Sequence, residues 1–291
     1  MENGKKLAEL LFANISKTPE YYENLYPERD LKEGARVTRF APSPTGFLHF
    51  GNLFTCFISY ITAKSTGGVF YVRVEDTDQK RKIDGAVDVM LRGLADFGIE
   101  PDEGVVGEKE ERGNYGPYYQ SQRKEIYQTF AKKLVEEGFA YPCFCTAEEL
   151  DELRASQENE DTKGYYGKYA KCRDLTFEEV KEKLDAGMPW TLRLRSPGAV
   201  DKKCVFEDMI KGKIEMPENI QDIVLLKSDG IPTYHFASIV DDHLMRTTHI
   251  VRGDEWISSC PIHIQLNRIL GFRIPKYVHV ATIMKNEGEG K

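Results

Sequence analysis

Hydrophobic positions along the chain follow two periods, one typical of strands and one typical of helices. Compact apolar and β-branched runs predict strands at 37–41, 69–74, 223–226 and 250–252. Apolar positions at helical spacing predict helices at 51–65, 84–97, 124–137 and 257–270. Because strand and helix alternate from residue 37 onward, a parallel sheet of the nucleotide-binding type is expected.

The middle of the chain has a different pattern, which predicts an inserted unit. Segments 146–149 and 176–179 both read Thr-x-x-Glu, the spacing of a capping box that begins a helix. The polar, Tyr- and Gly-rich segment 156–171 is expected to be an exposed loop, and 190–195 alternates like a strand with one solvated face. Parallel-strand patterns return at residue 223, so the α/β domain is expected to be interrupted.

The first 35 residues predict a helical extension packed on the main body. Leu7, Leu11 and Ile15 recur at helical spacing, and Pro19 stands in the first turn of a second short helix.

Composition narrows the class of protein. Of the 291 residues, 30% are charged and 41% are hydrophobic, the balance of a water-soluble globular protein. No apolar run approaches the ~20 residues that a membrane helix needs, and no secretory leader is recognisable. Six cysteines in such a chain favour free thiols or metal ligands in the cytoplasm. The net charge of −7 argues against non-specific nucleic-acid binding but does not exclude a local basic surface.

Segment 42–52 combines features that suit a phosphate group. Its prolines fix the direction in which the chain leaves the first strand, while Gly46 and Gly51 permit close backbone approach. The helix that follows begins with free N–H groups and the positive end of its dipole. His49 stands at this helix start, where an imidazole N–H can contact a phosphate oxygen as charge builds up in a transition state.

Four longer motifs carry a resemblance to a known family: RFAPSPTGFLHFGN at 39–52, RVEDTD at 73–78, PTYHFASIVDDH at 232–243 and RGDEW at 252–256. Together they resemble the glutamyl-tRNA synthetases, which belong to the class I aminoacyl-tRNA synthetases. The resemblance covers about 36–291 and implies an α/β fold, with a Rossmann-like parallel-sheet nucleotide-binding domain split by an inserted α+β connective domain. The residue pattern gives 1–35 as the N-terminal helical extension, which has no firm counterpart in the family. The boundaries implied for the rest are 36–115 for the first half of the catalytic domain, 116–222 for the connective, tRNA acceptor-binding insertion and 223–291 for the second half.

The resemblance also implies the substrate-binding residues. For glutamate they are Arg39, Ala41, Ser43, Glu75, Tyr234, Ser238 and Arg252. For ATP they are His49, Gly51, Asn52, Glu255 and Trp256, of which His49, Gly51 and Asn52 are the catalytic positions. Asn52 replaces the second histidine of the general class motif, and Ser238 stands where some members have Asn.

Physical chemistry supports the glutamate pocket independently. Glutamate has two carboxylates and one ammonium, and guanidinium forks bind carboxylates well. Arg39, Glu75 and Arg252 all stand at the ends of predicted strands, whose carboxyl ends gather over the ligand crevice of a parallel sheet.

The implied reaction is ATP-dependent activation of L-glutamate to glutamyl-adenylate, followed by transfer to the 3′ end of tRNA(Glu). ATP would arrive with Mg²⁺, the tRNA(Glu) acceptor end is the implied partner, and a cytoplasmic monomer is expected. In the family a lysine-rich loop and an anticodon-binding region follow at about the point where this chain ends, Lys291. We therefore expect a fragment that binds substrates but activates glutamate poorly.

The inserted unit holds candidates for RNA contacts, because RNA ends are held by aromatic stacking and phosphate contacts. They are Tyr118, Tyr119, Arg123, Arg193 and Arg195, and for each an ordinary packing role is an equal alternative.

Cysteines in the same unit have the spacing of a partial zinc site. Cys143, Cys145 and Cys172 supply three thiolates, and Tyr169 or Tyr166 would have to complete a tetrahedral set. Because no histidine lies near, ordinary reduced thiols are the favoured alternative.

Other functions remain as alternatives. A glutamyl-queuosine-tRNA(Asp) synthetase has a similar length, but the N-terminal extension, Thr77 and the missing lysine-rich loop oppose it. A glutaminyl-tRNA synthetase is less favoured. A non-catalytic ATP- or tRNA-binding paralogue is opposed by the presence of Arg39, His49 and Glu75 together.

Overall fold

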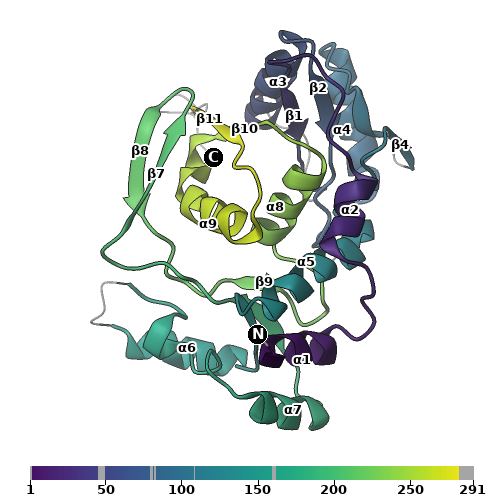
Figure 1. Cartoon of the computed structure of the whole chain (residues 1–291). Helices are drawn as coiled ribbons and strands as arrows, with labels where there is room; N and C mark the ends of the chain where they lie inside the picture. Colours follow the sequence, from purple (N-terminus) through teal and green to yellow (C-terminus); the bar gives the residue numbers. More distant parts are fainter. Residues whose placement is uncertain are drawn as a thin grey trace.

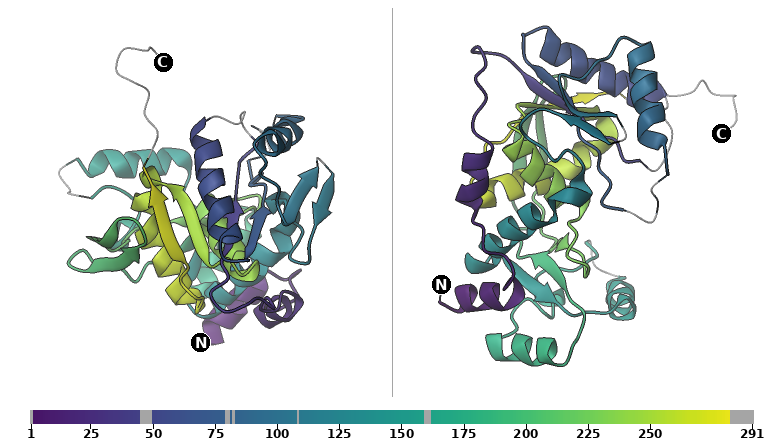
Figure 2. Two further views of the ribbon diagram at one scale, coloured as in Figure 1. Left: turned by 90° about the horizontal axis from the view of Figure 1, so that it is seen from above. Right: turned by 90° about the vertical axis from the view of Figure 1, so that its right-hand side faces the viewer.

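The structure, a computed structural model, describes residues 2–44, 50–78, 81, 83–107, 109–158 and 162–281. Figure 1 shows an elongated molecule in which a part built on parallel strands lies above a smaller part built on antiparallel strands. The right-hand view in Figure 2 shows the same division from the side.

Parallel strands form the centre of the upper part. Its two four-stranded sheets have the orders β1-β2-β3-β4 and β10-β11-β7-β8. The strands are β1 (Val37–Phe40), β2 (Val69–Val72), β3 (Glu103–Gly107), β4 (Glu110–Arg112), β7 (Lys203–Asp208), β8 (Gly212–Pro217), β10 (His249–Gly253) and β11 (Lys276–Val280). The sheets meet between β1 and β10, where the N–H of Thr248 donates to the carbonyl of Val37 at 2.9 Å. Since β1, β2 and β3 pair in parallel, as do β10 and β11, the Rossmann-like fold is confirmed.

Helices cover both faces of the β10–β11 pair. α3 (Phe50–Lys64) packs through Phe54 and Ile58 on the face formed by Val251, Val278 and Val280. α9 (Cys260–Leu270) packs on the opposite face, which carries Ile250 and Tyr277. Because successive side chains of a strand point to opposite faces, this alternation buries the strands on both sides.

The remaining helices of the upper part are α4 (Ala86–Asp96), α5 (Lys124–Glu136) and α8 (Tyr234–Leu244). The predicted helices 51–65, 84–97 and 124–137 are confirmed. In 257–270 the first residues belong to a 3-10 helix, Asp254–Ser259, and the α-helix begins only at Cys260, with Pro261 in its first turn.

An antiparallel sheet forms the lower part. Its order is β5-β6-β9, built from β5 (Ala140–Cys143), β6 (Thr191–Leu194) and β9 (Val224–Leu226). The prediction that 223–226 belongs to the parallel sheet was wrong, because β9 pairs antiparallel with β6. Two helices flank this sheet, α6 (Ala147–Ser156) and α7 (Phe177–Asp185), and each begins with the predicted capping box, at Thr146 and Thr176.

The segment 156–171 is less exposed than its polar sequence predicted. Gln157, Tyr165 and Ala170 are buried among its described residues. The side chain of Gln157 exchanges hydrogen bonds with the backbone of Gly164, at 2.7 and 2.9 Å, which closes the segment on itself. The N–H of Tyr165 donates to the side chain of Gln221 at 3.0 Å, which holds the segment against the body.

The N-terminal helices are integrated into the main core. α1 (Glu2–Leu11) and α2 (Pro19–Leu25) pack against α5, and Ala8, Phe12 and Tyr22 are buried in the same hydrophobic cluster as the sheet residues. Among the residues that the structure describes, no helix is long and apolar enough to cross a membrane.

Candidate active site

A cavity of about 490 Å³ opens at the carboxyl ends of β1 and β10. Its lining includes these predicted substrate-binding residues: Arg39, Ala41, Ser43, Gly51, Asn52, Glu75, Tyr234, Arg252, Glu255 and Trp256. Ser238 is buried one helical turn after Tyr234 on α8 and does not line the cavity. His49 lies outside the described residues.

A buried ion-pair cluster forms the floor around Arg39. The Nε of Arg39 donates to Asp242 at 3.0 Å, and Arg73 donates to the same oxygen at 2.8 Å. Arg73 also donates to Glu75 at 3.0 Å. Burial alone would raise the pKa of Asp242, but the two guanidinium groups beside it outweigh burial and lower that pKa.

The neighbouring Asp241 extends this cluster toward the segment 120–127. It accepts hydrogen bonds from Gln120 at 2.8 Å, Arg123 at 2.7 Å and Tyr127 at 2.8 Å. Three arginines therefore face three carboxylates in a buried network, which leaves the cluster close to neutral.

Glu75 reaches the cavity from the segment that follows β2. Its pKa is raised mainly by burial, against the opposing effect of Arg73 and Arg39. A buried carboxylate with a raised pKa gains from a cationic ligand, so this position suits an ammonium group.

An aromatic pair closes the other side of the cavity. The ring centroids of Tyr234 and Trp256 lie 4.9 Å apart, and 38% of the Trp256 surface remains exposed. Burial, helped by the negative charge of Glu75, raises the pKa of the Tyr234 hydroxyl, so it stays protonated as a hydrogen-bond donor.

A match to a family model identifies the protein family of this chain. The model for the catalytic domain of class I tRNA synthetases for glutamate and glutamine (E and Q) matches residues 36–290. This chain belongs to that family. Because the matched residues contain the entire cavity lining, the cavity lies within the synthetase catalytic domain.

Several curated relatives of this synthetase domain carry the same name. The chain is 54% identical over 288 residues to the glutamate–tRNA ligase of Clostridium perfringens, a match that covers 99% of this chain and 53% of the relative. It is 53% identical over 284 residues to that of Acetivibrio thermocellus, covering 97% and 52%. The chain thus spans about half the length of the curated relatives it matches.

Solved structures agree with these relatives. The crystal structure of a glutamate tRNA ligase from Elizabethkingia meningosepticum in complex with its amino acid superimposes with a TM-score of 0.79 at 40% identity. The match covers 89% of this chain and 51% of that one. A glutamate-tRNA synthetase from Elizabethkingia anophelis gives the same score and identity.

Most of the predicted RNA-contacting side chains of this synthetase domain are buried, so those predictions were wrong. Tyr118, Tyr119, Arg123 and Arg193 are each less than a tenth exposed. They hold the protein interior together: Tyr118 donates to Glu103 at 3.1 Å, and Arg193 donates to the carbonyl of Asp222 at 2.8 Å. Arg195 is the partly exposed member of the set, and it pairs with Asp174 at 2.8 Å.

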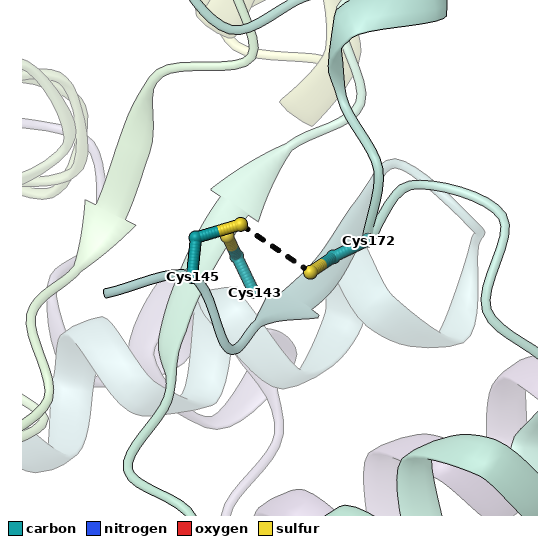
Figure 3. A group of neighbouring side chains, drawn as sticks. All are labelled: Cys143, Cys145 and Cys172. Atoms are coloured by element: carbon teal, nitrogen blue, oxygen red, sulfur yellow. Dashed lines mark hydrogen bonds between the residues drawn. The ribbon is translucent and has the colours of Figure 1, made fainter. Parts of the chain in front are cut away.

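The three predicted cysteines converge in the lower part of the domain. The sulfur atoms of Cys143, Cys145 and Cys172 all lie within 4.8 Å of one another (Figure 3). The phenol beside them is that of Tyr165, whose oxygen lies 3.4 Å from the sulfurs of Cys143 and Cys145. Tyr169, the predicted fourth member, packs its ring edge-on against Tyr166.

Sequence reasoning missed several residues that shape the site. Arg73, Asp241 and Asp242 build the floor, and Tyr165 joins the cysteines. A signal existed for the first three, since they stand inside the quoted motifs and interrupt otherwise apolar runs. No spacing rule distinguished Tyr165 from Tyr166 and Tyr169.

Proposed function

We propose that this chain binds L-glutamate and ATP and forms glutamyl-adenylate, as the catalytic portion of a glutamate–tRNA ligase. The observation that carries the proposal is the meeting of Arg39, Glu75 and Arg252 in one cavity at the carboxyl ends of parallel strands. Relatives that are 54% identical over nearly the whole chain and bear the name glutamate–tRNA ligase support it.

In this proposal the amino-acid site combines cations for the carboxylates with Glu75 for the ammonium. Arg39, Arg252, Ala41, Ser43 and Tyr234 line the glutamate side of the cavity, and Ser238 is buried one helical turn after Tyr234 on α8. Glutamate carries a net charge of −1, so a pocket whose ion-pair floor is nearly neutral needs one further positive charge. Arg252 supplies it, because its hydrogen-bond partners are uncharged.

The ATP site lies where α3 begins. Gly51 and Asn52 stand in the first turn of α3, whose dipole and free N–H groups favour phosphate, while Trp256 offers a partly exposed ring for the adenine. Glu255 lines the same side of the cavity. His49, outside the described residues, is proposed for phosphate contact on the strength of its motif alone.

Catalysis requires positioning rather than a protein nucleophile. The substrate carboxylate attacks the α-phosphorus of ATP, the bond to the leaving pyrophosphate breaks, and the site holds both reactants in line. Mg²⁺ bound to ATP would neutralise phosphate charge. The product is proposed to be transferred to the acceptor end of tRNA(Glu) in the cytoplasm, a reducing compartment that suits six described cysteines with no disulfide among them.

Ligand-induced stabilisation tests this function. At about a hundredfold excess over Kd, 5′-O-[N-(L-glutamyl)sulfamoyl]adenosine should stabilise the chain by roughly 2.7 kcal/mol, several degrees of Tm. The shift, taken relative to each ligand-free protein, should disappear in Arg39→Ala and persist in Arg154→Ala, an exposed arginine on α6. An equal shift with the glutaminyl analogue, or none with either, would contradict the proposal.

We further propose that the cysteine cluster holds zinc. Zinc–sulfur bonds of about 2.3 Å place tetrahedral thiolates roughly 3.8 Å apart, and the sulfurs of Cys145 and Cys172 lie 3.6 Å apart. The three thiolates and the Tyr165 oxygen thus fit the metal. Zinc here would tie the end of β5 to the segment that precedes α7, a structural role remote from the cavity.

Metal analysis of purified protein tests the zinc site. We expect about one zinc per chain, loss of the metal in Cys172→Ser and retention in Cys204→Ser, a buried cysteine outside the cluster. Tyr165→Phe should weaken zinc retention, whereas Tyr169→Phe should not. Protein that carries no zinc after expression with added zinc, and gains no thermal stability when zinc is supplied, would exclude the site.

A further inference from the structure

Arg252 is surrounded by neutral hydrogen-bond acceptors. Its Nε donates to Nε2 of His279 at 3.0 Å, Nη2 donates to the Cys260 sulfur at 3.1 Å, and Nη1 lies 3.4 Å from Nδ1 of His263. In the described part of the chain no carboxylate stands within 4.0 Å of this guanidinium. Arg39 differs, because Asp242 already compensates its charge.

The guanidinium of Arg252 has more N–H groups than these three contacts use. A guanidinium has five N–H groups, and the three contacts use one on each nitrogen. One N–H therefore remains on each terminal nitrogen, the pair that can bind both oxygens of a carboxylate.

The same contacts fix the tautomer of His279. Because Nε2 must accept from Arg252, the ring proton stands on Nδ1, which lies 2.7 Å from Asp208. Burial and the nearby Arg252 charge lower the pKa of His279, and Asp208 opposes this without reversing it, so the ring stays neutral. A protonated His279 would present a second N–H to Arg252 and break the contact.

Asp208 is itself held firmly by its surroundings. One of its oxygens accepts from the N–H groups of Ile210 and Lys211 at 2.9 Å, in the turn between β7 and β8. The other accepts from the backbone N–H of His279 as well as from its ring. This hairpin runs beside β11 (Figure 1), and both Asp208 and His279 are fully buried.

We propose that Asp208 and His279 are positioning residues for the amino acid: the carboxylate sets the His279 tautomer, and His279 orients the Arg252 guanidinium toward a substrate carboxylate. The inference rests on the proposed function, since it assumes that Arg252 binds glutamate. It assigns the β7–β8 hairpin, which forms the far edge of the β10-β11-β7-β8 sheet, a part in amino-acid recognition.

Two pairs of matched variants separate positioning from folding. In His279→Gln the side-chain amide oxygen can occupy the place of Nε2 and still accept from Arg252. In His279→Asn the shorter amide reaches Asp208 but not Arg252. Asp208→Asn turns the acceptor facing the ring into a donor and favours the opposite tautomer, whereas Asp254→Asn changes a partly exposed carboxylate that pairs with Lys211 of the same hairpin.

Calorimetric titrations with two ligands provide the test. For the glutamyl sulfamoyl adenosine, we expect Kd to rise on the order of tenfold to a hundredfold in His279→Asn and Asp208→Asn. It should change little in His279→Gln and Asp254→Asn. Binding of α,β-methylene-ATP, which lacks the amino acid, should stay within about twofold in all four.

The outcomes are distinct. Unchanged glutamyl-analogue binding in His279→Asn and Asp208→Asn would overturn the inference, as would an equal loss of both ligands, which indicates general damage. Unchanged binding in Arg252→Ala would also overturn it and would remove Arg252 from the proposed glutamate site, whereas the continued binding of the glutamyl analogue would still agree with the proposed substrates. A wild-type chain that binds the ATP analogue but not the glutamyl analogue would refute the proposed function itself.

Discussion

At the residue scale, Asp242 is the residue whose charge holds two arginines at the cavity floor. Arg39 and Arg73 both donate to one of its oxygens, and both are buried. Buried ion pairs contribute little net stability compared with a well-packed apolar core, but removing one partner leaves an uncompensated charge.

Asp242→Asn should therefore lower the free energy of unfolding by about 3–5 kcal/mol. Urea denaturation measures this change. Asp185→Asn, which breaks an exposed pair with Lys181, is the matched control and should cost less than about 0.5 kcal/mol. If both variants lost an equally small amount of unfolding free energy, the cluster would tolerate an unpaired arginine.

Buried histidines predict an acid-sensitive fold. Burial, helped by Arg252, lowers the pKa of His235 from 6.5 to about 4, and burial lowers that of His249 to about 4. Between pH 6.5 and about pH 4, these two histidines are protonated in the unfolded chain but neutral in the folded protein. Stability should therefore be intact above pH 6.5 and fall as the pH decreases toward 4, by up to about 1.4 kcal/mol per pH unit for each histidine.

Chemical denaturation at several pH values measures that slope. His235→Asn removes one titrating group while keeping an acceptor for His263, which lies 3.0 Å away. The slope between pH 6.5 and 4 should become shallower in this variant. An identical slope would assign the acid sensitivity to other groups.

The sequence allowed a site residue to be predicted when the position of that residue in a strand or motif was enough to place it at the cavity. Arg39 and Arg252 stand near the ends of apolar strand patterns and inside long motifs, so strand order alone brought them together. His279 and Tyr165 could not be assigned, because their roles depend on partners 71 and 20–22 residues away. Such pairings follow from tertiary packing, which no local period records.

At the scale of elements, the capping boxes show local sequence deciding where a helix begins. The Thr176 hydroxyl accepts from the N–H of Glu179 at 3.3 Å, and Glu179 accepts in return from the N–H of Thr176 at 2.7 Å. Thr176→Ala removes one of these bonds and should destabilise the protein by about 1 kcal/mol. Thr176→Ser retains the hydroxyl, so thermal denaturation should show it close to wild type.

Two of the elements that escaped prediction, α8 and β11, share a physical cause. α8 has no polar face for a period to reveal, because eight of its residues are buried, among them Asp241 and Asp242. β11 is buried along most of its length and likewise shows no alternation. The prediction of a strand at 223–226 was correct, but the prediction that this strand pairs in parallel was wrong. An apolar run does not specify whether the neighbouring strand is parallel or antiparallel.

At the scale of the whole molecule, the N-terminal extension belongs to the core rather than lying on it. Ala8 of α1 is fully buried against the body, and Lys132 of α5 binds both Glu9 and the carbonyl of Ile15. Ala8→Asp should lower the free energy of unfolding by at least about 2 kcal/mol, through a charge that must be buried or an undocked helix.

Lys5→Asp, at an exposed position of the same helix, should have little effect on unfolding. Binding of the glutamyl analogue should be unchanged in both variants at temperatures where they are folded, because α1 does not line the cavity. A loss of binding in Ala8→Asp would show that the extension and the site are coupled.

The joining of distant strands has a consequence for how the protein is made. During synthesis, Val37 of β1 cannot form its hydrogen bond with Thr248 until Thr248 has been added to the chain. In the same way, Asp208 cannot bind His279, which is synthesised 71 residues later. At about 5–20 residues per second a ribosome needs roughly 4–14 s to cover that interval. For several seconds the nascent chain therefore exposes an unpaired strand edge and Asp208, an aspartate that is buried and paired in the folded protein, and a chaperone can bind during this time. Amino-acid recognition becomes possible only after β11, which contains His279, has been synthesised.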